Sequence, residues 1–206
     1  MPPAFVYFDL GNVVFAFDRG RAFRQMAAVC GADPAVVGEV VMAGGLQERL
    51  ERGDCDWEGF HAEFSRRTGT ASDPEALARA ASDMFALRAE ILPVIAALER
   101  LGCPIGILSN TCGPHWRQLL EGRYAILPGG FREIVLSHEV RSSKPDPGIY
   151  AEAARRAGVP PERIFFCDDL PGHVAAARRA GWDAELFVSA AGLVDALARR
   201  GLNLGL

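Results

Sequence analysis

The sequence predicts an α/β fold, in which a three-layer core with a five-stranded parallel sheet carries a small all-helical cap inserted after the first strand. From residue 88 to the end, short apolar runs alternate with helical segments, which is typical of a parallel sheet covered by helices on both faces. Residues 18–87 contain helical patterns and no convincing strand. These helices are too many for one crossover connection, so we expect a core of residues 1–17 and 88–206 and a separate cap of residues 18–87.

The composition suits a protein with a substantial hydrophobic core. The chain has 206 residues, 50% of them hydrophobic, which fits one domain with a modest insertion or a core domain with a small cap. The net charge is −4 and basic residues are scattered among acids, so we expect no nucleic-acid partner. No apolar run approaches the ~20 residues of a membrane helix, and the first residues show no signal-peptide pattern, so we expect no membrane partner. We expect a monomer or a homodimer.

Cysteine usage indicates a reducing compartment. The chain has five cysteines, an odd number, and no C-x-x-C pair. This pattern disfavours a zinc site and favours reduced thiols, most of them small core residues. We therefore expect a cytoplasmic protein. The five are Cys30, Cys55, Cys103, Cys112 and Cys167.

The first strand is predicted from the run VYF at residues 6–8, which stops at Asp9 and is followed by LGN. A continuous apolar run rich in aromatic and β-branched residues is typical of a strand buried on both faces. A carboxylate at the carboxyl edge of such a strand, before a glycine turn, lies where open α/β sheets bind ligands. The alternative is that Asp9 only caps the turn.

Capping residues divide the cap region into helical segments. Aspartates stand at several predicted N-termini, prolines in first turns and glycines at C-termini. Trp57, Phe60 and Phe64 recur at spacings of three and four, so we expect them to form the core of the cap rather than a platform for substrate. The expected segments are 18–30, 33–42, 46–52, 56–69 and 72–85.

The rest of the chain supplies the other strands and the helices between them. Four further apolar runs are expected to be strands, at residues 104–108, 134–136, 163–167 and 184–188. Helices are expected at residues 92–101, 114–121, 147–157, 171–180 and 193–200. No element is assigned to the connection from Gly122 to Gly130.

Polar side chains gather at the ends of three predicted strands. Asp9 follows the first, Ser109 and Asn110 follow the second, and Asp168 and Asp169 follow the fourth. The carboxyl ends of parallel strands meet at one edge, where three carboxylates repel one another unless a cation lies among them. Oxygen ligands without His or Cys indicate Mg²⁺, which also takes a substrate phosphate oxygen. The alternative is that one acid of the adjacent pair caps the following helix.

Two further features favour a phosphorylated substrate. Ser109 and Asn110 offer a hydroxyl, an amide and backbone N–H groups at a strand-to-helix turn, which together can hold phosphate oxygens. Lys144, in the stretch SSKPDPGIY, supplies a point charge that can hold both a phosphate and a nucleophile. Taken alone, each signal is weak, since such residues are also common in solvated loops.

Four motifs together resemble a known family. FDLGN at residues 8–12, LSNT at 108–111, KP at 144–145 and FFCDD at 165–169 occur in this order. The set resembles the haloacid dehalogenase (HAD) superfamily of aspartyl-nucleophile phosphatases over nearly the whole chain, and within it subfamily IA, whose helical cap is of the C1 type. FDLGN is similar to the motif of bacterial sugar-phosphate phosphatases and, more distantly, of the phosphatase domain of bifunctional epoxide hydrolases. The resemblance implies a Rossmann-like core with a small helical cap.

The same resemblance implies a role for each matching residue. Asp9 would be the nucleophile that forms an aspartyl-phosphate, and Lys144 would neutralise the phosphoryl group and orient Asp9. Ser109 and Asn110 would hold the phosphoryl group. The implied Mg²⁺ ligands are Asp9, the backbone carbonyl of Gly11, Asp169 directly, and Asp168 directly or through water.

The sequence departs from the family pattern at Gly11, where the first motif usually has a second Asp that acts as general acid and base. Losing such help costs about 10² to 10⁴ in rate. Either another group donates the proton, or the substrate has a good leaving group, such as an anomeric sugar, acyl or aryl phosphate. His115 is a candidate donor or substrate contact, although a surface position is an equally good interpretation. Asn12 is expected to orient the loop or a metal-bound water.

A second departure is His173, at a place where the family often has Asn. It either supports the acidic pair or faces solvent. The leading hypothesis is a Mg²⁺-dependent phosphatase of a small phosphorylated metabolite, with a sugar phosphate as one candidate. One alternative is a dehalogenase that acts on carbon–halogen bonds, which the acidic pair disfavours. The other is a catalytically weak binding or regulatory protein, which Gly11 favours.

Overall fold

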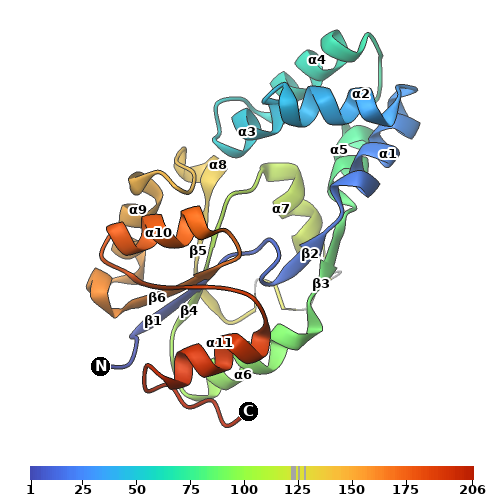
Figure 1. Ribbon diagram of the computed structural model, residues 1–206. Coiled ribbons are helices and arrows are strands. Elements are labelled where there is room, and N and C mark those ends of the chain that lie inside the picture. Colours follow the sequence, from blue (N-terminus) through green and yellow to red (C-terminus); the bar gives the residue numbers. More distant parts are fainter. Residues whose placement is uncertain (122–123, 125, 128) are drawn as a thin grey trace.

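The computed structural model describes residues 1–121, 124, 126, 127 and 129–206. Its centre is a five-stranded parallel sheet in the order β5-β4-β1-β6-β7 (Figure 1). The predicted α/β fold with five parallel strands is confirmed, each strand lying within a few residues of its predicted place. The strands are β1 (Phe5–Phe8), β4 (Ile105–Ser109), β5 (Phe131–Leu136), β6 (Ile164–Asp168) and β7 (Asp183–Leu186).

The central strand β1 is buried on both faces, as its apolar run predicts. Val6 and Phe8 contribute to the hydrophobic cluster beneath α6 and α11, whereas Phe5 and Tyr7 contribute to the cluster on the opposite face beneath α9 and α10. All four side chains are fully buried, and the one polar group among them, the Tyr7 hydroxyl, donates to the Ala153 carbonyl at 2.9 Å. The four covering helices are α6 (Leu92–Arg100), α11 (Ala190–Ala198), α9 (Pro147–Ala157) and α10 (Pro171–Arg179).

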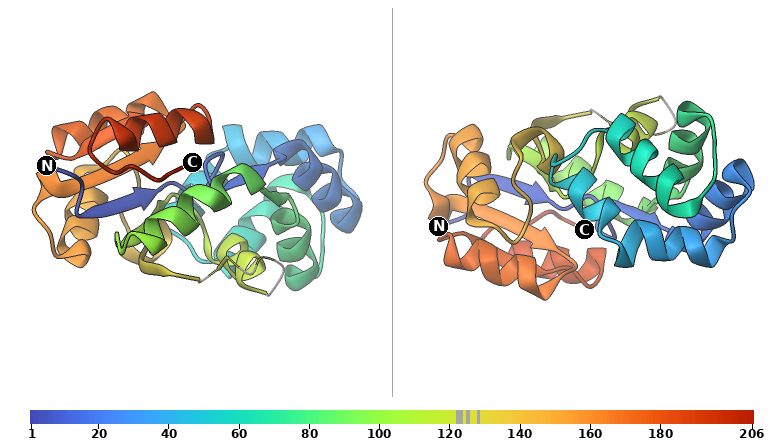
Figure 2. Two further views of the ribbon diagram at one scale, coloured as in Figure 1. Left: turned by 90° about the horizontal axis from the view of Figure 1, so that it is seen from below. Right: turned by 90° about the horizontal axis from the view of Figure 1, so that it is seen from above.

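The helical region packs around a third hydrophobic cluster of its own, at one end of the molecule (Figures 1 and 2). Phe60 and Phe64 are fully buried in this cluster, as expected for core residues, and the partly buried Trp57 stacks on Phe60 at 4.7 Å between ring centroids. Trp57 and Phe60 also line the cavity described below, which the prediction of a purely structural role did not anticipate. Asp18, Asp33, Asp56 and Asp73 each accept a hydrogen bond from a first-turn N–H, which explains where four of the helices begin. The helices are α1 (Arg19–Cys30), α2 (Pro34–Gly38), the π-helix η1 (Glu39–Ala43), α3 (Leu46–Glu51), α4 (Trp57–Thr68) and α5 (Pro74–Ser82).

A two-stranded antiparallel sheet joins the helical region to the core, and it corrects one prediction. The last helix of the cap region was expected to run to Phe85, but α5 ends at Ser82. Strand β3 (Phe85–Leu87) instead pairs with β2 (Phe15–Phe17), so the chain leaves and re-enters the core side by side. Strands of three residues are too short to show an alternating pattern, which is why the sequence analysis missed them.

Short elements complete the described fold. One of them, α8 (Ser137–Val140), was not predicted, and it packs against α3. The predicted connection from Gly122 to Gly130 lies partly outside the described residues. The remaining elements are η2 (Ala89–Ile91), α7 (Gly113–Leu120) and η3 (Pro161–Arg163).

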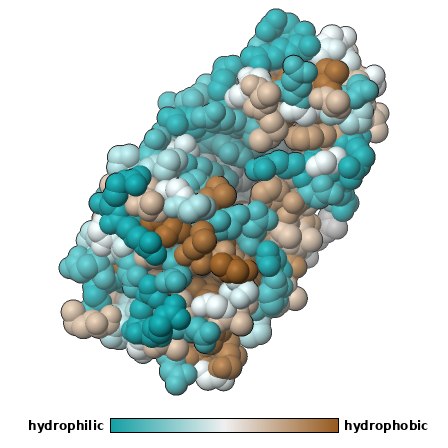
Figure 3. Space-filling model, in the orientation of Figure 1, coloured by the Kyte–Doolittle hydropathy of each residue, from teal (hydrophilic) through white to brown (hydrophobic). Residues whose placement is uncertain are grey.

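The free cysteines and the largely hydrophilic surface agree with the expectations from the composition. All five thiols are free, and Cys30, Cys112 and Cys167 are buried. Within the described part of the chain, no single helix has the length and apolarity to cross a membrane, and only α1 with the following helical segment passes such a test, as a pair bent by 116°. Figure 3 shows a largely hydrophilic face on which hydrophobic residues gather on the core beside the helical region.

Candidate functional site

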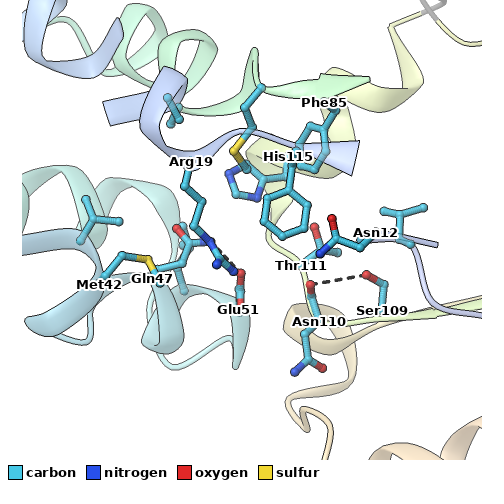
Figure 4. A pocket seen from close by; sticks show the side chains of 18 of the residues that line it. Asn12, Arg19, Met42, Gln47, Glu51, Phe85, Ser109, Asn110, Thr111 and His115 are labelled. Carbon is cyan, nitrogen blue, oxygen red and sulfur yellow. Dashed lines mark hydrogen bonds between the residues drawn. The ribbon is translucent and has the colours of Figure 1, made fainter. Parts of the chain in front are cut away.

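The carboxyl ends of β1, β4 and β6 open into a cavity of about 340 Å³ that lies between the sheet and helices α1 and α3. Asp9, Ser109 and Asp169 line it from the core, together with Lys144 from the loop before α9. Figure 4 shows Ser109, Asn110 and Thr111 facing side chains of the helical region across this space. The structure therefore brings together residues that are separated by up to 160 positions in the sequence.

Lys144 connects several polar groups at the cavity through hydrogen bonds. Its Nζ donates to Oδ1 of Asp9 at 2.7 Å, to Oδ2 of Asp168 at 2.6 Å and to the backbone carbonyl of Leu108 at 2.9 Å. The ammonium uses all three of its protons in these bonds. Lys144 and Asp168 are 3% and 0% exposed, so this arrangement is a buried, charge-assisted network.

Burial and neighbouring charges shift the pKa values of the two carboxyls that contact Lys144 in opposite directions. Burial raises the pKa of Asp9 to about 6, with Lys144 opposing the shift and Asp168 adding to it. Burial also acts to raise the pKa of Asp168, but Lys144 and His173 outweigh it and lower that pKa to about 2. For Lys144, burial lowers the pKa, and the two carboxylates more than reverse this effect, so the ammonium stays charged.

Three carboxylates converge where the sequence predicts a metal site. Asp9, Asp168 and Asp169 each offer an oxygen within 4.8 Å of the others. Asp168 is already engaged, because Oδ1 accepts from the Leu170 N–H at 2.8 Å and both oxygens approach His173. Asp168 thus holds the turn before α10, whereas the N-cap residue of that helix is Leu170 and no side chain caps it, so the alternative of a helix cap is wrong for Asp168. Asp169 is more available, since its one hydrogen bond among the described residues comes from Nδ2 of Asn12 at 2.8 Å.

The side chain of Asn110 has a different partner from the expected phosphate. Its Nδ2 donates to the Lys144 carbonyl at 2.8 Å, and its Oδ1 accepts from the Lys144 N–H at 2.8 Å. This pair of bonds fixes the loop that carries Lys144 and leaves little of the amide for a ligand. Among the residues that the structure describes, the hydroxyl of Ser109 has one long contact of 3.4 Å, to the Asn110 carbonyl, so it is freer to bind an anion.

Gly11 lies against Phe17, so a side chain at position 11 would crowd the Phe17 ring. A Cβ atom there would stand 3.0 Å from Cε1 of that ring, which would have to shift by a few tenths of an ångström. The ring is packed edge-on against Phe85 at 6.3 Å and beneath the guanidinium of Arg19 at 4.8 Å. A glycine at position 11 therefore suits the packing of the β2–β3 strands.

The two histidines singled out in the sequence have different surroundings. His115 is buried in the cavity wall with its ring against Phe85 at 5.4 Å, and burial lowers its pKa to about 4. It is therefore uncharged at neutral pH, which disfavours the role of proton donor. His173 supports the acidic pair, because its Nδ1 lies 3.0 Å from Oδ2 of Asp168.

The helical region adds polar residues that the sequence analysis missed. Arg19 on α1 and Gln47 and Glu51 on α3 line the same cavity, and Figure 4 shows their side chains grouped together. Gln47 and Glu51 lie one helical turn apart, and each directly follows a buried leucine, Leu46 or Leu50. This spacing in the sequence was a signal that could have placed both residues on one face of the helix. In one sequence, this signal does not distinguish a cavity from a solvated helix edge.

A comparison with known families agrees with this geometry. The model of the haloacid dehalogenase-like hydrolases matches residues 8–181 of the chain. The chain belongs to this family. It is therefore a HAD-like hydrolase, and residues 8–181 include all four motifs on which the resemblance was based.

Individual relatives include phosphatases and HAD enzymes. A glyceraldehyde 3-phosphate phosphatase of Methanopyrus kandleri is 34% identical over 95 residues, covering 45% of this chain and 39% of that protein. The chain thus spans well under half the length of this relative. A HAD-like hydrolase structure from Porphyromonas gingivalis is similar at a TM-score of 0.77, with 28% identity over 95% of this chain and 96% of that one. A HAD family enzyme from Bacteroides thetaiotaomicron, in complex with magnesium and inorganic phosphate, has a TM-score of 0.79 at 22% identity, covering 90% and 94% of the two chains.

Proposed function

We propose that this HAD-like hydrolase is a phosphatase of a small phosphorylated metabolite and works through an aspartyl-phosphate on Asp9. In this proposal, residues 18–87 act as a cap over a core of residues 1–17 and 88–206. The cap excludes water and selects the substrate, for which a sugar phosphate is one candidate. The M. kandleri relative, a phosphatase of a phosphorylated triose, supports this class of substrate.

The observation that carries the proposal is the convergence of Asp9, Asp168 and Asp169, the first two of which also contact the ammonium of Lys144. Asp9 stands at the end of the central strand, with one oxygen held by Lys144 and the carboxyl facing the cavity. Ser109 lies at the neighbouring strand end with a hydroxyl available for a phosphoryl oxygen. Attack by Asp9 on phosphorus, charge neutralisation by Lys144 and hydrolysis by water would complete the reaction.

The donor set fits Mg²⁺. Three carboxylates lie together with one lysine beside two of them, so a divalent cation would balance the remaining charge, and among the described residues no His or Cys belongs to the converging group. Asp9, Asp169 and the backbone carbonyl of Gly11 would hold the ion, with Asp168 binding directly or through water. When bound, Mg²⁺ supplies charge stabilisation to the phosphoryl oxygens in the transition state. The Bacteroides thetaiotaomicron relative was crystallised with magnesium and inorganic phosphate, which supports this assignment.

The acidic cluster also argues against the two alternatives. A dehalogenase that attacks carbon has no use for three carboxylates arranged to hold a cation. A catalytically silent protein has no need for a nucleophile whose oxygen is held at 2.7 Å by a buried lysine. Gly11 remains the feature that favours weak activity.

The test is phosphate release from a panel of phosphorylated metabolites by the wild type and by Asp9→Asn. We expect turnover that stops with a chelator, returns with Mg²⁺, and falls by about 10³-fold or more in the variant. A rapid acid quench of the wild type should trap a hydroxylamine-sensitive acyl phosphate on Asp9. The exposed Asp195→Asn on α11 is the matched control. Full turnover by Asp9→Asn would overturn the proposal.

A further inference from the structure

Gly11 leaves the proposed reaction without a general acid, and the cavity contains a carboxyl that no step above uses. Glu51 is the last residue of α3 and lines the cavity together with Asp9 and Ser109. Figure 4 shows its side chain on the side of the helical region, across the cavity from Ser109 and Asn110. Resting on the proposed phosphatase function, we propose that Glu51 donates the proton to the leaving group in place of a side chain at position 11.

The position of Glu51 suits the direction of phosphoryl transfer. The attacking and leaving oxygens stand roughly in line on opposite sides of phosphorus. Because Asp9 attacks from the end of β1, the leaving oxygen points away from the sheet and towards the helical region. A donor must therefore come from the cap side of the cavity, which is where α3 lies.

Glu51 is fixed to the core through its own backbone. The hydroxyl of the fully buried Ser137 donates to the Glu51 carbonyl at 2.5 Å and accepts from the Thr111 N–H at 3.0 Å. Two residues on, Gly53 lies so close to α8 that a Cβ there would stand 2.6 Å from the His138 carbonyl. The end of α3 is thus held, through Ser137, against the loop that follows Ser109, which places Glu51 beside the proposed phosphoryl site.

The Glu51 carboxyl can form further hydrogen bonds beyond those made within the described residues. Its one hydrogen bond among the described residues comes from Nε2 of Gln47, at 2.8 Å to Oε1, and it forms no ion pair with a described residue. Burial raises the pKa of Glu51, although Gln47 and the charges of Arg19 and Lys144 oppose the shift. A raised pKa is the direction that a general acid working near neutral pH requires.

His115 also lines the cavity and was the proton donor considered from the sequence, but it is the weaker candidate. Its lowered pKa means that the charged form, the one able to give up a proton readily, is scarce above about pH 4. It also packs edge-on against Phe85 in the buried wall. Glu51 is thus the better placed of the two.

The proton balance closes over the two steps. In the first, an oxygen of Asp9 bonds to phosphorus, the bond from phosphorus to the leaving oxygen breaks, and that oxygen takes the proton of the Glu51 carboxyl. In the second, a water oxygen bonds to phosphorus while the Glu51 carboxylate accepts its proton. The bond from phosphorus to Asp9 then breaks, which releases phosphate and regenerates both side chains.

The experiment compares the wild type, Glu51→Gln and the control Glu48→Gln, an exposed position on the same helix, in Mg²⁺ with alkyl phosphates and p-nitrophenyl phosphate. For alkyl phosphates, which need protonation, we expect kcat/KM of Glu51→Gln to fall about 10² to 10⁴-fold. With p-nitrophenyl phosphate, the rate at which Glu51→Gln forms the phosphoenzyme should change far less. Hydrolysis of the phosphoenzyme should be slower in this variant, so the phosphoenzyme accumulates. Glu48→Gln should match the wild type in kcat/KM for alkyl phosphates and in both the formation and the hydrolysis of the phosphoenzyme with p-nitrophenyl phosphate.

The outcomes separate this inference from the function on which it rests. A wild type that forms no phosphoenzyme on Asp9 would overturn both. A wild type that forms it, with Glu51→Gln losing the same factor for every leaving group or none at all, would overturn only the role of Glu51. Circular dichroism and thermal melts of the variants show that the comparison is made on folded protein.

Discussion

Lys144 is the only lysine among 22 lysine and arginine residues, and it is buried between the carboxylates of Asp9 and Asp168. A compact ammonium can reach Asp9, Asp168 and the Leu108 carbonyl at 2.6 to 2.9 Å at once. The planar guanidinium of arginine is wider and needs a different set of acceptor directions. The chain uses arginine where charges are solvated, and lysine at the one place where a point charge fits.

This packing predicts the effect of Lys144→Met. Without the ammonium, Asp9 and Asp168 remain buried with no cation between them, so we expect the free energy of unfolding to fall by about 3–5 kcal/mol. Lys144→Arg should recover little of the loss because of its shape. Urea denaturation in a chelator measures both, with the exposed Arg132→Met as the control. A Lys144→Met protein as stable as the wild type would show that the site tolerates uncompensated carboxylates.

At the scale of elements, Ser137 joins three of them. Its hydroxyl connects the end of α3, through the Glu51 carbonyl, to the loop after β4, through both backbone groups of Thr111. The residue belongs to α8, which the sequence analysis did not predict. One small side chain therefore sets how the end of α3 meets the core.

Ser137→Ala is expected to leave the buried Thr111 N–H without its acceptor. We predict a loss of about 1–3 kcal/mol in the free energy of unfolding, the usual cost of an unsatisfied buried group. We also predict a lower kcat, because Glu51 loses its anchor. Urea melts and steady-state kinetics provide the two readouts, and Ser142→Ala, whose hydroxyl makes no hydrogen bond within the described residues, is the control. Unchanged stability would mean that water replaces the hydroxyl.

The elements that the sequence predicted correctly are those with strong local signals. The four buried residues of β1 form a continuous apolar run, and the helix starts at Asp18, Asp33, Asp56 and Asp73 follow from a capping side chain that the structure confirms. The end of α5 and the β2–β3 pair were missed because their placement depends on pairing between residues about 70 positions apart. Such pairing leaves no local pattern.

For the site, residues at strand ends were predictable and residues in the helical region were not. Parallel strands bring Asp9, Asp168 and Asp169 to one edge whatever the details of packing, so their convergence follows from the fold. Glu51 and Arg19 reach the cavity only through the way that α1 and α3 sit over the sheet. In a chain with 26 acidic residues, nothing local distinguishes a glutamate that lines a cavity from one that faces solvent.

At the scale of the whole molecule, folding concentrates charge that the unfolded chain keeps apart. Asp9 lies more than 150 residues from Asp168 and Asp169, yet the fold places their oxygens within 4.8 Å of one another, and Lys144 pairs with Asp9 and Asp168. The folded state is therefore the one that binds a divalent cation. By mass action, any such cation raises the free energy of unfolding of the entire chain.

We therefore predict that MgCl₂ raises the melting temperature, whereas NaCl at equal ionic strength does not. The expected gain is about 2.7 kcal/mol when free Mg²⁺ is 100 times its dissociation constant, provided that the unfolded chain does not bind the ion. Asp169→Asn removes the most available carboxylate and should abolish most of the shift, while the exposed Asp195→Asn should keep it. Differential scanning calorimetry measures the shift directly and needs no substrate. A rise that persists in Asp169→Asn would place the cation elsewhere on the molecule and remove the charge argument for the site.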